Sequence, residues 1–145
     1  IKGPVMKSEI IKTMRNMKYG VEIKNPYLAK KIRELKKEYP ALLNITEPAS
    51  RNENEPYFKA ELTPVGLEYL NSIDTFDINE SIKAQEEYCK NTHNPHFAPK
   101  DGVCICRRNI YSEIKWTYSV TGISVQEAKT TLIIDCPHCN RSYCN

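Results

Sequence analysis

Cysteine is absent from the first 88 residues of this 145-residue chain, and all six cysteines lie between Cys89 and Cys144. Long apolar runs are also absent, since none approaches the roughly 20 residues that cross a bilayer. The N-terminus lacks the apolar segment of a signal peptide, and Ile1 to Val5 look like leader residues before a native start at Met6. We therefore expect no membrane span and a reducing, cytoplasmic location, where close cysteine pairs suit a metal better than three disulfides.

Acidic side chains are scarce in the first 40 residues, which hold eleven basic and four acidic residues, a net charge of +7. Residues 41–100 carry −5 and residues 101–145 carry +1, so the overall charge of +3 hides a basic N-terminal end. A concentrated basic surface favours an anionic partner, most often nucleic acid. The alternative interpretation is a pair of lysine-rich helices whose charged side faces water.

Helix-capping signals divide the first half of the chain. Asn25 before Pro26 is a strong helix start, Thr63 before Pro64 repeats it, and Pro40 disfavours helical geometry in the residue before it. A polar, proline-containing loop separates two apolar segments. The pattern predicts helices over 9–19, 26–39 and 64–70, and a hairpin of strands over 42–45 and 57–62.

The second half has fewer such signals. Asn79 is a suitable N-cap for a helix over 80–91. The apolar and aromatic residues of 110–120 predict one strand, which Gly122 ends. Ser124 and Glu127 form a capping box for a short helix to about Thr131. We therefore expect a strand and a helix between the two cysteine pairs of the C-terminal region.

Those two cysteine pairs predict a zinc site. Each pair can turn so that two sulfurs face one ion, and four thiolates without an open position are typical of structural zinc. The predicted ligands are Cys104, Cys106, Cys136 and Cys139. The first pair is one residue shorter than the usual C-x-x-C turn, which leaves room for other or additional ligands, or a second metal, at Cys89, His93, His138 and Cys144. Reduced, buried cysteines without a metal are the alternative.

Residues 7–71 resemble a winged-helix domain through two motifs. These are Asn-Pro-Tyr-Leu-Ala at 25–29 and Leu-Thr-Pro-x-Gly-x-x-x-Leu at 62–70. The resemblance implies that 26–39 is a recognition helix for the DNA major groove and that the hairpin loop is the wing. Carried over, the nucleic-acid contacts fall to Lys30, Lys31, Arg33, Lys36, Lys37 and, in the wing, Arg51.

The resemblance has one departure. Winged helices place a further helix before the recognition helix, and Val21 to Lys24 are too few to form one. The domain is therefore expected to be trimmed, or to lack its first helix at the N-terminus, and its wing is acidic. Trimmed winged helices serve as protein-binding modules as readily as they read DNA.

The C-terminal residues 93–97, 104–108 and 136–144 resemble the zinc-binding tails of small phage and prophage proteins. This resemblance implies an accessory protein of a mobile element and no particular activity. An enzyme is not expected: a zinc-supported nuclease of the His-Asn-His type needs a histidine between the cysteine pairs, and none lies between Cys106 and Cys136.

Together these features predict an α+β protein with two domains. A trimmed winged-helix-like domain covers 6–72, and a helix with a small zinc-ribbon-like or treble-clef-like domain covers 79–145. The expected function is DNA binding by a small zinc-binding regulatory protein of a mobile element, through helix 26–39. The alternative is a protein-binding module, such as a phage-encoded inhibitor of a host nucleic-acid-processing enzyme.

Overall fold

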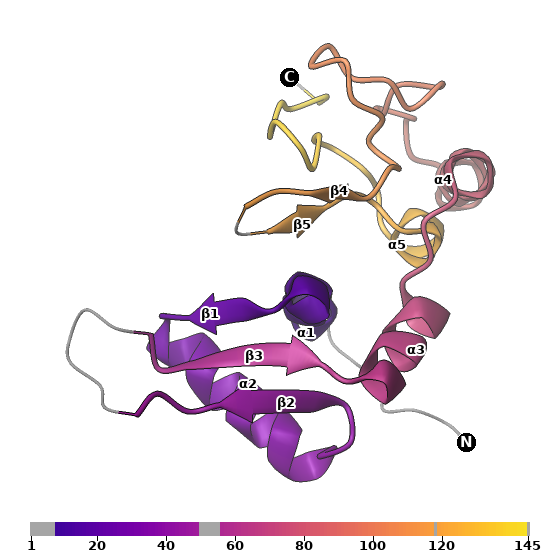
Figure 1. Ribbon diagram of the computed structural model, residues 1–145. Helices are drawn as coiled ribbons and strands as arrows, with labels where there is room; N and C mark the ends of the chain where they lie inside the picture. The colour runs from indigo at the N-terminus through magenta and orange to yellow at the C-terminus, as the bar shows by residue number, and fades with distance from the viewer. Residues whose placement is uncertain (1–7, 50–55, 118, 145) are drawn as a thin grey trace. The chain divides into compact units, whose positions relative to one another are not determined.

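The computed structural model describes residues 8–49, 56–117 and 119–144 and has a mixed α+β fold (Figure 1). The chain divides into two compact units, Ile1–Ser72 and Ile73–Asn145. Each contains helices and a small antiparallel sheet, which confirms the predicted α+β class. Within the described residues, no helix combines the length and apolar character that a membrane crossing needs.

The N-terminal unit is built on a three-stranded sheet. Its elements in chain order are α1 (Ser8–Asn16), the 3-10 helix η1 (Met17–Tyr19), β1 (Val21–Ile23), α2 (Pro26–Glu38), β2 (Leu43–Thr46), β3 (Phe58–Leu62) and α3 (Pro64–Ile73). The antiparallel strand order is β1-β3-β2, with Val21 opposite Ala60 and Leu43 opposite Leu62. The central strand β3 alternates buried and exposed residues, so one of its faces forms core.

Helix α2 begins and ends where local chemistry predicts. The Asn25 side chain accepts hydrogen bonds from the backbone N–H groups of Tyr27 and Leu28, at 2.8 and 3.2 Å, and Pro26 occupies the first turn. Ala29, Ile32 and Leu35 are buried along one side of the helix. The predicted range of 26–39 is therefore correct to one residue, and the polar side of α2 remains outward.

A glycine in α3 permits a close backbone approach. Gly66 N–H donates to the Thr63 hydroxyl at 3.0 Å, as expected for the predicted N-cap. A Cβ added at Gly66 would lie 1.9 Å from the carbonyl oxygen of Leu42. Thr63 N–H also donates to that carbonyl, at 3.0 Å. The Leu-Thr-Pro-x-Gly motif thus starts a helix and brings its first turn onto the segment before β2.

The C-terminal unit places two helices against the cysteine-rich segments. It contains α4 (Ile78–Thr92), the two-residue strands β4 (Ile114–Lys115) and β5 (Val120–Thr121), and α5 (Val125–Thr130). Its buried core includes Ile110, Tyr111, Ala128 and Ile133, together with two cysteines, Cys104 and Cys136. Because two cysteines belong to this small core, the cysteine chemistry and the packing of the unit cannot be separated.

Buried Gln85 joins three segments of the C-terminal unit. From α4, its side-chain amide donates to the carbonyls of Ala128 and Thr131, both at 2.9 Å. Its oxygen accepts from the Ile133 N–H at 3.0 Å and from the Cys89 thiol at 3.5 Å. A buried amide with all these partners is well satisfied. It fixes the end of α5 and the segment that leads to Cys136.

Two sequence predictions for this unit are wrong. Residues 110–120 do not form one strand, because the chain reverses inside them: Trp116 N–H donates to the Ser119 carbonyl at 2.7 Å, and β4 pairs with β5. The apolar residues of 110–120 predicted extended structure, but they gave no indication of the turn between β4 and β5. The N-cap of α4 is Asp77, whose side chain accepts from Glu80 N–H at 2.9 Å, and Asn79 lies inside the first turn. The capping box of Ser124 and Glu127 is confirmed.

Candidate metal centre and basic helix

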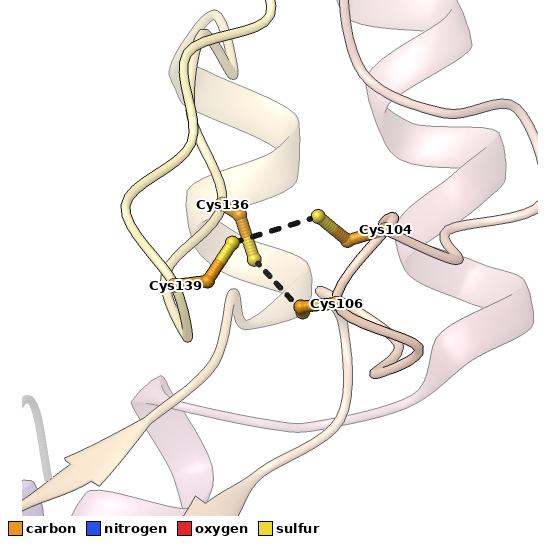
Figure 2. A group of neighbouring side chains, drawn as sticks. All are labelled: Cys104, Cys106, Cys136 and Cys139. Carbon is orange, nitrogen blue, oxygen red and sulfur yellow. Dashed lines mark hydrogen bonds between the residues drawn. The ribbon is translucent and has the colours of Figure 1, made fainter.

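The four cysteines predicted as ligands lie together and are here named the thiol cluster: Cys104, Cys106, Cys136 and Cys139 (Figure 2). Their Sγ atoms all lie within 4.8 Å of one another. Cys104 and Cys139 are 3.7 Å apart at Sγ, and Cys106 and Cys136 are 3.9 Å apart. Zinc–sulfur bonds of about 2.3 Å in a tetrahedron give sulfur–sulfur edges of about 3.8 Å. The two closest recorded edges of the cluster therefore match those of a tetrahedral zinc site, and the remaining ones lie within 4.8 Å.

Two short turns carry the cluster, the first knuckle (residues 103–109) and the second knuckle (residues 135–142). In the first, Cys104 N–H donates to the Arg108 carbonyl and Arg107 N–H donates to the Cys104 carbonyl, at 3.0 and 2.8 Å. In the second, Cys136 N–H donates to the Arg141 carbonyl and Asn140 N–H to the Cys136 carbonyl, both at 2.9 Å. The two turns use the same bonding scheme.

The first knuckle has one residue fewer between its cysteines than the second, and its hydrogen bonds are shorter in span by the same amount. Its inner hydrogen bond spans three residues, from Cys104 to Arg107, and the corresponding bond of the second knuckle spans four, from Cys136 to Asn140. In both turns the residue after the second cysteine has a left-handed backbone, with φ of 71° at Arg107 and 62° at Asn140. The short Cys104-x-Cys106 spacing thus requires no outside ligand to complete the cluster.

The structure gives the other candidate ligands different surroundings. His138 lies in the second knuckle, but both of its ring nitrogens have partners: Nε2 lies 2.9 Å from the Asn109 carbonyl oxygen, and Nδ1 lies 2.7 Å from the Thr121 hydroxyl. Cys89 is buried against Gln85, and His93 caps the end of α4 at the surface. Cys144 is exposed beside Ser142, at 3.5 Å. None of the four belongs to the thiol cluster.

Electrostatics distinguish the two buried cysteines. Burial raises the pKa of Cys136 to about 12, so its thiol stays neutral without a cation nearby. At Cys104 burial acts in the same direction, but the Tyr143 hydroxyl, the Cys106 backbone and the neighbouring thiols outweigh it and lower the pKa to about 6. A divalent cation would favour the thiolate form at all four positions. The donor set therefore suits a cation.

Tyr143 supplies an outer contact that no sequence pattern indicated. Its buried hydroxyl lies beside the Cys104 sulfur, whose pKa it lowers, but it makes no hydrogen bond of normal geometry to the described residues. Burial and the nearby sulfurs of Cys104 and Cys136 raise the pKa of this hydroxyl, so it remains a donor. A metal-bound thiolate is a better acceptor than a neutral thiol, and such outer donors tune metal sites. The unsatisfied hydroxyl is thus a second feature that fits a metal at the cluster.

All six cysteines lie in the described part of the chain, and all are unpaired. The cluster can hold one ion with four protein sulfurs, and the residues that the structure describes offer no fifth protein ligand there. Cys104 and Cys136 are buried, Cys106 is half-buried and Cys139 is exposed. A four-sulfur site of this kind crosslinks two turns and leaves no coordination position for a substrate. What the arrangement can do chemically is hold the knuckles together.

The basic residues of α2 fall into two groups. Arg33 makes a bidentate ion pair with Glu47, at 2.8 and 2.9 Å, and its guanidinium lies over the Phe58 ring at 4.5 Å. The Glu47 side chain raises the pKa of Arg33, and Arg33 lowers the pKa of Glu47. Lys36 donates to the carbonyls of Pro40 and Leu43, both at 2.8 Å. These two cations have intramolecular partners that explain their presence.

The remaining cations of α2 are Lys30, Lys31 and Lys37. Lys30 and Lys37 are exposed and seven residues apart, so they share a helix face. Tyr27 precedes them on the same side, 55 % exposed, with the Lys31 ammonium 5.5 Å from its ring centroid. Arg51 lies outside the described residues. The basic surface of α2 is therefore narrower than the sequence count of five cations indicated.

Comparison with protein-family models, with curated proteins and with solved structures finds no match for this chain.

Proposed function

We propose that this chain is a DNA-binding regulatory protein with a trimmed winged-helix N-terminal unit and a C-terminal unit held by structural zinc. The observation that carries the proposal is the outward face of α2, where Tyr27, Lys30 and Lys37 lie opposite the buried Ala29 and Ile32. The exposed Glu34 and Glu38 share this face, so it offers an aromatic ring and separate lysines for phosphate rather than a uniformly basic surface. A helix with one buried side and an outward side that carries lysines and an aromatic ring has the form of a groove-reading helix.

The hairpin after α2 supports the same function. Strands β2 and β3 pair in register directly after the helix, as the winged-helix resemblance implies for a wing. The segment Val21–Ile23, too short for a helix, forms β1 at the sheet edge instead. Arg33 ties α2 to Glu47 at the start of the hairpin loop, so helix and hairpin would meet a ligand as one body.

Zinc fits the thiol cluster better than calcium or magnesium does. Four thiolates are soft ligands that zinc accepts in tetrahedral geometry, whereas calcium and magnesium require oxygen. In this proposal the ion supplies crosslinking stability, and the DNA contact lies in the other unit. The two roles can therefore be tested separately.

The test is a gel shift of duplex DNA with the double variant Lys30→Ala/Lys37→Ala. Removing two phosphate interactions should reduce the slope of log affinity against log salt by about 1.8, and affinity should fall for every sequence tested. The matched control is Lys83→Ala/Lys90→Ala, which removes two exposed lysines with the same spacing from α4. We expect that control to bind like the parent protein.

Two results would overturn the proposal. One is the absence of any duplex shift at low salt. The other is equal loss of binding in both double variants, which would indicate a general charge effect. Capture of a specific protein partner that survives nuclease treatment, without any duplex shift, would favour the protein-binding module instead.

A further inference from the structure

A second basic, aromatic surface lies on the C-terminal unit, where the first knuckle meets the β4–β5 hairpin. The Arg108 guanidinium lies over the Trp116 ring, 4.9 Å from its centroid. Arg107 and Arg108 are both exposed, and Trp116 is half-buried. Residues 103–109 contain these two arginines and no acidic residue. We name this surface the arginine–tryptophan platform: Arg107, Arg108 and Trp116.

A chain of hydrogen bonds fixes the Trp116 ring of the platform in position. Trp116 Nε1–H donates to the Thr121 hydroxyl at 2.7 Å, and Thr121 lies 2.7 Å from His138 Nδ1. His138 Nε2 lies 2.9 Å from the Asn109 carbonyl oxygen, so the chain ends in the first knuckle. Both knuckles and the hairpin therefore fix the position of the indole. A fixed aromatic ring presents a stacking surface at little entropic cost.

Arg107 occupies a conformation that arginine seldom adopts. Its φ is 71°, in the left-handed region where glycine or asparagine fits with less strain. The corresponding position of the second knuckle, Asn140 at φ 62°, holds one of those favoured residues. An arginine kept at such a position is most simply explained by a use for its charge.

The chemistry of the platform indicates which anion it fits. A guanidinium stacked on an indole keeps its N–H edge free to donate to phosphate oxygens, and the aromatic pair can stack with a base. Helix α4 does not offer a uniformly basic face for a DNA groove, because its exposed residues include Glu80, Glu86 and Glu87 as well as Lys83 and Lys90. The surface consists of turns and a hairpin, a form that suits unpaired nucleotides.

We propose that the arginine–tryptophan platform binds unpaired nucleotides of a single-stranded nucleic acid, with phosphates at Arg107 and Arg108 and a base stacked on the Arg108–Trp116 pair. The site is separate from α2 and takes a different form of nucleic acid. It depends on the proposed function only for the general class of ligand.

Trp116 provides a direct readout because it is the only tryptophan in the chain. The full-length, zinc-loaded protein is titrated with oligothymidylate of about 15 nucleotides while its emission is followed. We expect saturable quenching whose affinity weakens with salt. Arg107→Gly should reduce the affinity about three- to tenfold and lower the salt slope by about 0.7, with an unchanged or raised melting temperature because glycine suits this backbone. Arg107→Asn, which mimics Asn140, should behave in the same way.

The outcomes separate this site from α2. Lys30→Ala/Lys37→Ala should leave the quenching by the single strand intact even where it abolishes the duplex gel shift. The platform assignment is overturned if saturating oligonucleotide leaves Trp116 emission unchanged, or if both Arg107 variants bind like the parent. Equal quenching by duplex DNA or by polyglutamate of similar length would overturn the assignment to unpaired nucleotides.

Discussion

Chelation of the proposed zinc ion should unfold the C-terminal unit and leave the N-terminal unit folded. All four sulfurs of the thiol cluster lie in the C-terminal unit, and two of them, from Cys104 and Cys136, are part of its core. A 73-residue unit has a total stability of about 4–11 kcal/mol at the usual value per residue. Zinc at 1,000 times its dissociation constant contributes about 4.1 kcal/mol. The metal term is therefore comparable to the whole stability of the unit.

The size of the expected spectral change follows from the helices. Helices α4 and α5 hold 21 of the 53 residues in the described α-helices. Chelation should thus remove about two-fifths of the helical signal in far-UV circular dichroism. The emission of Trp116 should shift to the red at the same chelator concentration, because the ring loses its burial and its Thr121 hydrogen bond. Elemental analysis should give one zinc per chain before chelation and none after it.

Matched cysteine variants control this experiment. Cys136→Ser removes a buried sulfur of the thiol cluster and should reproduce the metal-free spectrum even in excess zinc. Cys144→Ser changes an exposed cysteine outside the cluster and should retain one zinc and the parent spectrum. A metal-free protein that keeps its full helical signal and an unshifted Trp116 emission would falsify the reasoning, since the core would then hold without the crosslink.

Two further predictions concern individual side chains. Gly66→Ala would place a Cβ 1.9 Å from the Leu42 carbonyl oxygen, so the overpacking cost of about 1–3 kcal/mol should exceed the gain in helix propensity of about 1 kcal/mol. Denaturant unfolding should therefore show a loss of stability, whereas Glu68→Ala, at an exposed position of the same helix, should not. Tyr143→Phe removes the buried hydroxyl beside the sulfurs and should lower zinc affinity about 10- to 100-fold in chelator competition, with the fold intact in excess zinc. An unchanged zinc affinity would show that the hydroxyl donates to no metal-bound thiolate.

The predictable parts of this protein are those determined by neighbouring residues. Asn25 with Pro26 and Ser124 with Glu127 satisfy backbone groups within three residues, so the starts of α2 and α5 follow from sequence alone. The same holds for the thiol cluster, because two cysteines close together in a turn must lie close in space. Only the close approach of the two knuckles depends on the fold. It was predictable because a structural zinc ion needs four ligands and each cysteine pair supplies two.

The missed parts depend on partners distant in sequence. Val21–Ile23 is a strand only because β3 lies beside it, and no local signal distinguishes three such residues from a linker. Similarly, His138 stood among the candidate ligands because histidine binds zinc, yet its nitrogens face Asn109 and Thr121. The Tyr143 hydroxyl reaches the sulfurs through the fold and follows no periodic pattern.

The basic residues show why a charge count alone overstates a binding surface. Arg33 and Lys36 belong to the most basic helix, but Arg33 pairs with Glu47 and Lys36 donates to two backbone carbonyls. Their substitution should therefore reduce the stability of the fold more than the affinity for a ligand. Arg107 belongs to residues 101–145, whose net charge is only +1, so a count of charges along the chain gives no indication of a binding surface there. Its strained backbone and exposed side chain give it a stronger claim to a ligand. A cation with intramolecular partners is explained by the fold, whereas an exposed cation without them is a better candidate for binding a ligand. This criterion identifies binding residues better than the density of basic residues along the chain does.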